Sequence, residues 1–236
     1  MLKIRSKLFS LIIREQIKNF EDSRIGIKIK NIRYKPFMKN REIMILEEII
    51  RNLNPKNCLE WGSGYSTIYL PKLLLKDANW LAIEHCSDWA NKINQMNFNS
   101  GVNIKYIPPN NYPWSDNNND GSHEDLIDYI EFPDNHAPYD FILIDGQARL
   151  ECIKKSFDLI TDMGVVVLHD ANRMYYHKNI EIYPNQVFFP IHGRKGLGLW
   201  IGSKELKINE VLNVTSHKNL ERLHLFFYNL RKRVSK

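Results

Sequence analysis

The chain of 236 residues is 43% hydrophobic and 25% charged, which excludes collagen, a disulfide-rich scaffold and a largely disordered chain. Its formal net charge is +6, yet residues 1–20 carry +4 and residues 217–236 carry +5, so the residues between them carry the remaining −3. Because the basic character is confined to the two ends, we predict no nucleic-acid groove over the centre and no nucleic-acid partner.

The cysteine spacing and the length of the apolar runs limit the class of protein further. Cys58, Cys86 and Cys152 lack the paired spacing of a zinc site, and we interpret them as free thiols in a reducing compartment. No apolar run reaches the roughly 18 residues that span a bilayer. The basic N-terminus lacks the apolar stretch and cleavage site of a signal peptide. We therefore expect a cytoplasmic protein.

The first predicted element is a basic amphipathic helix over residues 1–20. Apolar residues fill most of its surface, and four basic residues share one face. These are Lys3, Lys7, Arg14 and Lys18. A helix of this kind either lies on an anionic membrane surface or packs against its own domain or a partner. Because residues 21–40 have an irregular pattern, we treat residues 1–35 as a basic N-terminal extension.

The central part of the chain alternates between helix and strand patterns. Residues 41–53 predict a helix, which Asn54 and Pro55 end. The predicted strands then cover residues 58–61, 80–84, 102–107, 141–144 and 164–168, and the predicted helices cover residues 66–75, 89–96, 124–130 and 150–160. Residues 108–120, rich in Asn, Asp and Pro, predict a long loop. The alternation predicts a parallel sheet with helices on both faces.

Toward the C-terminus the pattern changes to an antiparallel hairpin. Residues 186–190 and 198–201 flank a glycine-containing turn and would complete a sheet of seven strands. Residues 206–236 predict a basic helical segment with an apolar stripe. The stripe consists of Leu220, Leu223, Phe227 and Leu230. The domain expected to carry the function is therefore residues 36–205.

The most informative motif is a glycine turn after the first predicted strand. Gly62-Ser63-Gly64 lets a ligand approach the backbone closely, and Glu84 ends the next strand twenty residues after Gly64. An acid at that position can hold ribose hydroxyls, so this layout is typical of a nucleotide-type cofactor site. Glu60, shortly before the glycines, would repel a pyrophosphate but suits a cationic ligand such as the ammonium group of S-adenosylmethionine (SAM).

Four segments resemble the class I SAM-dependent methyltransferases. They read LEWGSGYST, AIEH, YDFILIDGQARLECI and GVVVLHDANR. They are most similar to a bacterial group with an EWGSG-type first motif and an IDGxxR…HDxxR pair, and distantly to plant xylan-glucuronate O-methyltransferases. The resemblance covers residues 36–202. It implies a Rossmann-like methyltransferase fold, mostly parallel, with SAM as the cofactor.

Carried over to this chain, the resemblance implies which residues hold the cofactor. The methionine part of SAM would lie against the first motif. The residues concerned are Glu60, Gly62, Ser63, Gly64, Ser66 and Thr67. Glu84 would bind the ribose hydroxyls, and His85 would lie beside the adenine. Asp145 occupies a position at which class I enzymes commonly have a polar group for the cofactor.

The acceptor side is expected where the fourth and fifth predicted strands end. Asp145, His169 and Asp170 lie there, so each is a candidate base for the proton of an acceptor hydroxyl. Asp145, Asp170 and Asn172 also resemble, loosely, the oxygen ligands of catechol-type O-methyltransferases and would suit Mg²⁺ or another hard cation. Ala171 separates two residues that are adjacent in that family. The alternative is that Asp145 contacts SAM and Asp170 acts without a metal.

Three more side chains are candidates for binding the acceptor. Arg149 and Arg173 either neutralise the nearby acids or hold an anionic substrate such as a uronate. Trp114, in the long loop, either stacks on a sugar ring or anchors the loop. We therefore predict O-methylation of a hydroxyl or carboxylate group on a sugar, a glycan or another small molecule.

Two alternatives from other classes remain open at this point. The first is a NAD-type dinucleotide-dependent oxidoreductase, against which Glu60 and the replacement of the third glycine by Thr67 argue. The second is a non-catalytic membrane-peripheral protein with a vestigial cofactor site, which the basic ends favour. Contact with the inner face of the membrane is also compatible with the enzyme. The sequence contains no signal for an oligomeric state.

Overall fold

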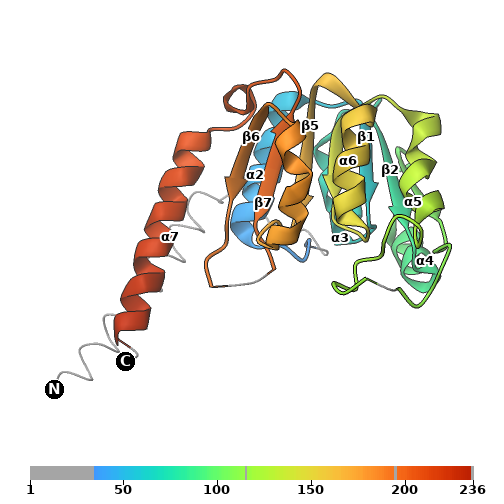
Figure 1. Cartoon of the computed structure of the whole chain (residues 1–236). Coiled ribbons are helices and arrows are strands. Elements are labelled where there is room, and N and C mark those ends of the chain that lie inside the picture. The colour runs from blue at the N-terminus through green and yellow to red at the C-terminus, as the bar shows by residue number, and fades with distance from the viewer. Residues whose placement is uncertain (1–34, 115, 194–195, 235–236) are drawn as a thin grey trace. The chain divides into compact units, whose positions relative to one another are not determined.

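The computed structural model describes residues 35–114, 116–193 and 196–234 (Figure 1). Residues 34–221 form one compact unit, and residues 1–33 together with 222–236 form a second. We describe the first unit by itself. The predicted helix over residues 1–20 lies outside the described residues. No helix in the described part of the chain is both long and apolar enough to cross a membrane.

Seven strands form one sheet in the order β3-β2-β1-β4-β5-β7-β6. The strands are β1 (Asn57–Trp61), β2 (Asn79–Glu84), β3 (Val102–Tyr106), β4 (Tyr139–Ile144), β5 (Ile160–His169), β6 (Asn185–Phe189) and β7 (Leu199–Ser203). Strands β1 to β5 pair in parallel, whereas β7 runs antiparallel to both β5 and β6. The prediction of a mostly parallel seven-stranded sheet with a C-terminal antiparallel pair is confirmed.

Helices and short 3₁₀ turns connect the strands. The helices are α2 (Asn40–Leu53), α3 (Tyr65–Tyr69), α4 (Ser87–Met96), α5 (Ile127–Glu131), α6 (Arg149–Leu159) and α7 (Val214–Val234). The 3₁₀ turns are η2 (Leu70–Leu73), η3 (Phe132–His136), η4 (Met174–Lys178), η5 (Ile180–Ile182) and η6 (Ile208–Glu210). The single helix predicted over residues 66–75 is therefore divided, because Pro71 lacks the N–H that would continue the α-helical hydrogen bonds.

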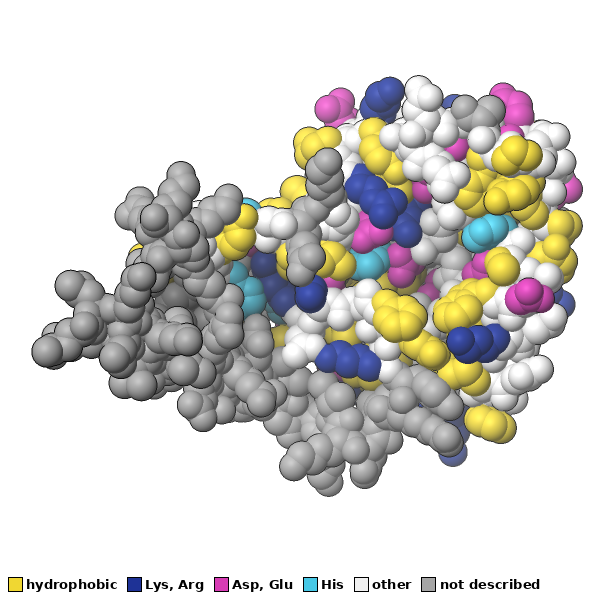
Figure 2. All heavy atoms as spheres, turned by 90° about the horizontal axis from the view of Figure 1, so that it is seen from below, with side chains coloured by type: hydrophobic (Ala, Val, Ile, Leu, Met, Phe, Trp, Pro, Cys, Tyr) yellow, Lys and Arg dark blue, Asp and Glu magenta, His cyan; other side chains and the backbone are white. Residues whose placement is uncertain are grey.

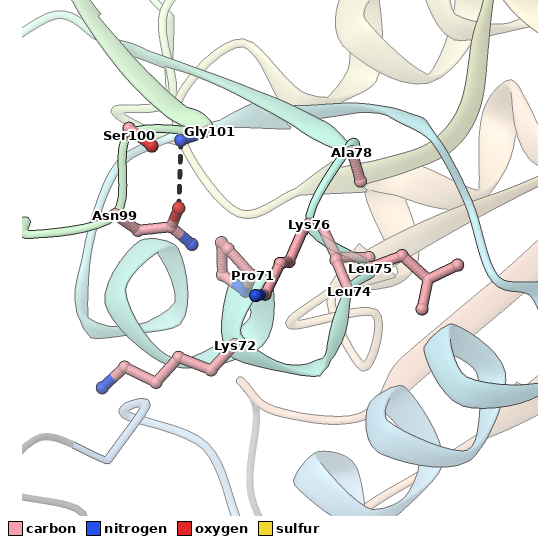
Figure 3. Close-up of a pocket in the computed structure, with 9 residues that line it drawn as sticks. All are labelled: Pro71, Lys72, Leu74, Leu75, Lys76, Ala78, Asn99, Ser100 and Gly101. Atoms are coloured by element: carbon pink, nitrogen blue, oxygen red, sulfur yellow. Dashed lines mark hydrogen bonds between the residues drawn. The ribbon is translucent and has the colours of Figure 1, made fainter.

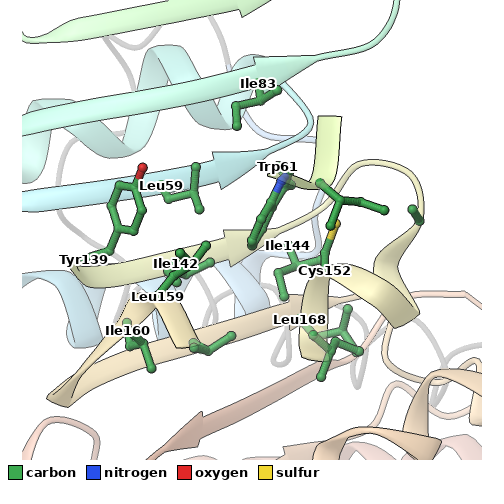
Figure 4. Close-up of a cluster of buried hydrophobic side chains, with 14 of the residues drawn as sticks. Leu59, Trp61, Ile83, Tyr139, Ile142, Ile144, Cys152, Leu159, Ile160 and Leu168 are labelled. Atoms are coloured by element: carbon green, nitrogen blue, oxygen red, sulfur yellow. The ribbon is translucent and has the colours of Figure 1, made fainter. Parts of the chain in front are cut away.

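Alternate residues of the central strands point to opposite faces of the sheet. Leu59, Trp61, Ile142 and Ile144 all join the apolar cluster that α6 covers, which Figure 4 shows. Helix α2 lies on the opposite face (Figure 1). Glu60 follows Leu59 in the strand, so its side chain points away from the α6 cluster. The alternation of side chains along β1 thus determines the face of the sheet on which Glu60 is buried.

The crevice for a ligand is set by the strand order. The chain proceeds from β1 to β2 and β3 on one side and from β4 to β5 on the other, so the connections diverge between β1 and β4. Ligands of open α/β sheets bind beyond the carboxyl ends of the strands at such a switch point. The fold therefore directs attention to the loops that follow β1 and β4.

Candidate cofactor and acceptor site

The predicted site residues meet at one edge of the sheet. The glycine turn follows β1, Glu84 ends β2, Asp145 follows β4 and His169 ends β5. These four strands are parallel, so their carboxyl ends lie along the same edge. Figure 2 looks toward this edge, where acidic, histidine and basic side chains gather among apolar ones. The prediction that these strand ends come together is borne out by the geometry.

Two glycines bring the loops after β1 and β4 into backbone contact. Gly62 has φ +93°, and a Cβ atom there would lie 2.5 Å from the Cα of Gly146. A Cβ on Gly146 would in turn lie 2.1 Å from Tyr129 Oη. Gly64 differs, because a Cβ there would meet only Ser66 Oγ, at 3.6 Å. Gly62 and Gly146 therefore close the switch point, while Gly64 leaves backbone open to a ligand.

Glu60 is enclosed by its own chain. It is fully buried and accepts hydrogen bonds from Ser66 Oγ at 2.5 Å, Thr67 Oγ1 at 2.7 Å and Trp80 Nε1 at 2.8 Å. Thr67 Oγ1 also accepts the N–H of Gly64 at 2.8 Å. These side chains bond to one another and hold the glycine turn in shape, and a direct contact of Glu60, Ser66 or Thr67 with the cofactor stays a prediction.

Burial weakens the charge argument built on Glu60. Burial is the main cause that raises the pKa of this carboxyl group, and the hydrogen bonds from Ser66, Thr67 and Trp80 oppose it only in part. The resulting pKa is about 8. The raised pKa favours the uncharged form of this carboxyl group, which weakens its charge as an argument for a cationic ligand.

Replacing Glu60 with Gln tests this protonation state. The pKa is about 8 in the folded chain against 4.5 ordinarily, so the stabilisation from the protonated form is complete below about pH 4.5 and is lost as the pH rises through 8. We expect the free energy of unfolding of the wild type to fall by ~4 kcal/mol relative to Glu60→Gln between pH 5 and pH 9. Urea unfolding at both pH values measures this difference. A constant difference between the two proteins would contradict a neutral Glu60.

Glu84 ties the end of β2 to the glycine turn. Its Oε2 accepts hydrogen bonds from Ser63 N at 2.9 Å and Ser63 Oγ at 3.1 Å, and its Oε1 accepts from Cys86 N at 3.0 Å. His85 Nδ1 lies 3.0 Å from Glu84 Oε1. The carboxylate is 3% exposed. Glu84 therefore lies directly beside Ser63 and Gly64. This proximity is required if Glu84 and the glycine turn hold the same ligand.

Aromatic rings border the Glu84 side of the site. His85 packs on Trp114 with ring centroids 5.6 Å apart, and Tyr112 packs on the other side of Trp114 at 5.7 Å. The Trp114 Nε1 atom is buried and has no hydrogen-bond partner among the described residues. Trp114 thus lies on the cofactor half of the site, beside His85. The prediction that Trp114 binds the acceptor stays a prediction.

Asp116 and Asp120 give the long loop after β3 a defined shape. Asp116 accepts the N–H groups of Asn118, Asp120 and Gly121. Asp120 is 6% exposed and accepts Arg149 N and Tyr176 Oη, both at 3.1 Å. The loop is therefore anchored to the first residue of α6, next to the acceptor half. The Asx-rich composition predicted a loop but not this anchor.

Arg149 is a structural cation of the acceptor half. Its Nε donates to Gly146 O at 2.8 Å and its Nη1 donates to His169 O at 2.8 Å. The guanidinium also lies 3.3 Å from Asp145 Oδ1 and 3.3 Å from Asp170 Oδ2. With 8% exposure and its nitrogens engaged, Arg149 pairs with these acids, which favours the first of its two predicted roles, and the second, holding an anionic substrate, stays a prediction.

His169 is buried beside two carboxylates, which raise the pKa of its ring. Its Nδ1 lies 2.8 Å from Asp145 Oδ1. Burial opposes the charge on the ring, but the Asp145 carboxylate and then Glu42 outweigh burial and raise the pKa of His169 to about 10. A ring already protonated at neutral pH cannot take a proton from an acceptor. The raised pKa disfavours His169 as the base, and its catalytic role stays a prediction.

Asp170 is strained and ionised. Its φ is +60°, in the left-handed region, and its Oδ1 accepts Leu197 N at 2.6 Å. Burial opposes ionisation, but Arg149 and then His169 outweigh it and lower the pKa of Asp170. Arg173 Nη2 lies 3.1 Å from Asp170 Oδ2, with 39% of the Arg173 side chain exposed. Arg173 is thus the one of the two predicted arginines that reaches solvent beside this acid.

The three oxygen ligands predicted for a metal are directed elsewhere. Asp145 and Asp170 both face the Arg149 guanidinium, and Asn172 Nδ2 donates to Ile191 O at 2.7 Å. Asn172 Oδ1 accepts Ile191 N at 3.3 Å. Among the described residues, no group of three or more His, Cys, Asp or Glu side chains is placed to hold a metal ion. The residues do not fit a divalent cation.

A hollow of about 370 Å³ lies away from the site (Figure 3). It is bordered by the turns that precede β2 and β3, including Pro71, Lys76 and Asn99. These turns lie at the amino ends of the two strands, opposite the edge that carries Glu84. The hollow therefore takes no part in the candidate site.

Comparison with known proteins gives the class of the fold. No protein-family model matches the sequence, and no curated protein matches it. An O-methyltransferase from Bacillus cereus, solved with SAH, is 18% identical with a TM-score of 0.53, covering 79% of this chain and 87% of that one. The O-methyltransferase TomG from Streptomyces achromogenes, solved with SAM, is 16% identical with a TM-score of 0.52, covering 78% and 86%.

A third structure agrees with these two. A methyltransferase-like protein from Silicibacter pomeroyi is 19% identical with a TM-score of 0.53, covering 72% of this chain and 89% of that one. At such identities the likeness shows the fold alone. The fold is the Rossmann-like methyltransferase fold, as the sequence motifs implied.

Proposed function

We propose that this chain is a SAM-dependent methyltransferase that transfers a methyl group to an oxygen atom. The observation that carries the proposal is the pairing of an open Gly64 backbone with Glu84 at the switch point of this fold. The solved structures with the same fold that contain SAH or SAM support the choice of cofactor. Because Glu60 is buried and its raised pKa favours the uncharged form, its charge no longer supports SAM over a dinucleotide.

The described residues fit SAM in three places. The backbone at Gly64 would receive the methionine part, and the Glu84 carboxylate would accept hydrogen bonds from the ribose hydroxyls. His85 and Trp114 would contact the adenine, and the unpartnered Trp114 Nε1 supports a polar contact there. When bound, SAM supplies a methyl group on a positively charged sulfur.

The acceptor half would bind and deprotonate the substrate. Asp145 is 22% exposed at its side chain, more than Asp170 at 16%, and Arg149 and His169 lie beside both acids. We propose that Asp145 accepts the hydrogen bond of an acceptor hydroxyl and takes its proton as the new O–CH₃ bond forms. The partly exposed Arg173 suits an anionic group on that acceptor, which favours an acidic sugar or glycan.

A metal has no part in this proposal. Asp145 and Asp170 would have to release Arg149 before they could face a divalent cation, and Asn172 would have to release Ile191. The donor set therefore does not suit the oxygen-rich coordination that Mg²⁺ requires.

Calorimetric titration tests the cofactor assignment. We expect SAM and SAH to bind one site on the whole chain in the micromolar range, and NADH to give no heat of binding. The reverse order would favour the dinucleotide-dependent oxidoreductase, and no binding of SAM at high micromolar concentration would refute the proposal.

The basic ends motivate a separate proposal about location. We propose that residues 1–20 and 217–236, with +4 and +5, bring the enzyme to an anionic membrane surface. Co-sedimentation with anionic vesicles should then be lost when both segments are removed. Binding that persists without them would refute the ends as the anchor.

A further inference from the structure

Trp89 of α4 holds a carbonyl group of the glycine turn, although it lies outside the four sequence motifs. Its indole Nε1 donates to Ser63 O at 2.7 Å, and the residue is half-buried. Tyr65 packs against the indole with ring centroids 6.1 Å apart, and Lys92 Nζ lies over the ring, 4.7 Å from its centroid. A side chain from the helix after β2 thus reaches back to the turn after β1.

The backbone around this carbonyl group is held by further side chains. Ser63 N donates to Glu84 Oε2 at 2.9 Å, and Gly64 N donates to Thr67 Oγ1 at 2.8 Å. The peptide between Ser63 and Gly64 therefore has its carbonyl oxygen bonded to Trp89 and its N–H bonded to Thr67. Both polar groups of this peptide are engaged within the protein, so these two side chains fix the orientation of its plane.

The orientation of this peptide decides how the turn meets a ligand. Gly64 has φ −176° and ψ −159°, and a Cβ atom there would meet only Ser66 Oγ, at 3.6 Å. Glycine itself permits many values of φ, so the residue does not fix this conformation by its own sterics. The hydrogen bonds from Trp89 and to Thr67 therefore keep the open side of Gly64 in one place.

We propose that Trp89 is a positioning residue for the amino-acid half of the cofactor, acting through the peptide between Ser63 and Gly64. The inference rests on the proposed function, which places the methionine part of SAM along Gly64 and the ribose against Glu84. The loss of the Trp89 hydrogen bond should therefore affect the binding of the amino-acid half and leave the binding of the adenosine half unchanged.

Trp89→Phe tests this division of the cofactor. The variant removes the N–H donor and keeps an aromatic ring beside Tyr65. We expect SAH to bind it about three- to tenfold more weakly, because a hydrogen bond that orders the turn is lost. Adenosine, which is SAH without the homocysteine part, should bind the variant as it binds the wild type. Calorimetric titration of the whole chain with each compound measures both affinities.

Trp200→Phe is the matched control. Trp200 Nε1 donates to Gln186 Oε1 at 2.8 Å, between β7 and β6, and the residue is 1% exposed. This control loses a hydrogen bond of the same kind at a more buried position, yet it should bind SAH as the wild type does. A loss of SAH affinity in Trp89→Phe but not in Trp200→Phe would exclude a general weakening of the fold as its cause.

An SAH affinity in Trp89→Phe equal to that of the wild type would overturn the inference, as would an equal loss of affinity for adenosine and SAH. One further measurement needs no variant. In ¹⁵N-labelled wild type, the Trp89 indole N–H should exchange with water more slowly than that of free tryptophan, and equally rapid exchange would also overturn the inference. Failure of the wild type to bind SAH, with the indole N–H protected, would instead overturn the proposed function.

Discussion

Glu84→Ala should lower the affinity for SAH by at least about 100-fold. A carboxylate that accepts hydrogen bonds from two hydroxyls contributes ~1.5–3 kcal/mol for each bond to a charged group. The variant also removes the acceptor that holds Ser63 N and Cys86 N, so the turn loses part of its shape. Calorimetry with SAH measures the change.

The control for this loss is Glu181→Ala, which removes an exposed carboxylate from η5, away from the glycine turn. It should bind SAH as the wild type does. Circular dichroism should show that Glu84→Ala remains folded at the temperature of the titration. An affinity in Glu84→Ala equal to that of the control would remove the ribose role from this acid.

Gly62→Ala should destabilise the fold, whereas Gly64→Ala should keep the fold stable and weaken the binding of SAH. At Gly62 the new methyl group would lie 2.5 Å from Gly146 Cα at φ +93°, so we expect a loss of ~3 kcal/mol or more in the free energy of unfolding. At Gly64 the φ of −176° suits alanine and the nearest atom is 3.6 Å away, so the fold should change by less than ~1 kcal/mol.

The affinity for SAH should reveal the defect of Gly64→Ala, which the free energy of unfolding does not. The methyl group at Gly64 would project into the space that the cofactor needs, and we expect Gly64→Ala to be folded but to bind SAH at least tenfold more weakly. Urea unfolding and calorimetry on the same samples measure both effects. If Gly64→Ala bound SAH normally, the cofactor would not approach the backbone at this turn.

The sequence predicted the sheet and the gathering of strand ends because both follow from local patterns. Apolar runs of strand length placed Glu84, Asp145 and His169 each at the end of a strand, and parallel strands end at one edge. The sequence motif predicted that Glu60 contacts the cofactor, because Glu60 lies close to the glycines along the chain. Its actual partner, Trp80, comes from the neighbouring strand and is set by the face on which the strand buries the side chain.

The contacts between distant segments could not be predicted in the same way. Glu42 lies 127 positions before His169 and 156 before Gly198, and no pattern in the sequence relates them. The only local signal for Glu42 is its place three residues after Lys39, the residue that caps the start of α2, which indicates a helix cap and nothing more. The anchoring of Asp120 to Arg149 is likewise a product of the tertiary fold.

A crystal structure of the chain with SAH tests the central claim most directly. We predict that the ribose hydroxyls lie within hydrogen-bond distance of Glu84, that the methionine part passes along Gly64, and that the sulfur faces Asp145. SAH bound with its ribose away from Glu84, or with its sulfur directed away from Asp145, would contradict the proposed function of this site.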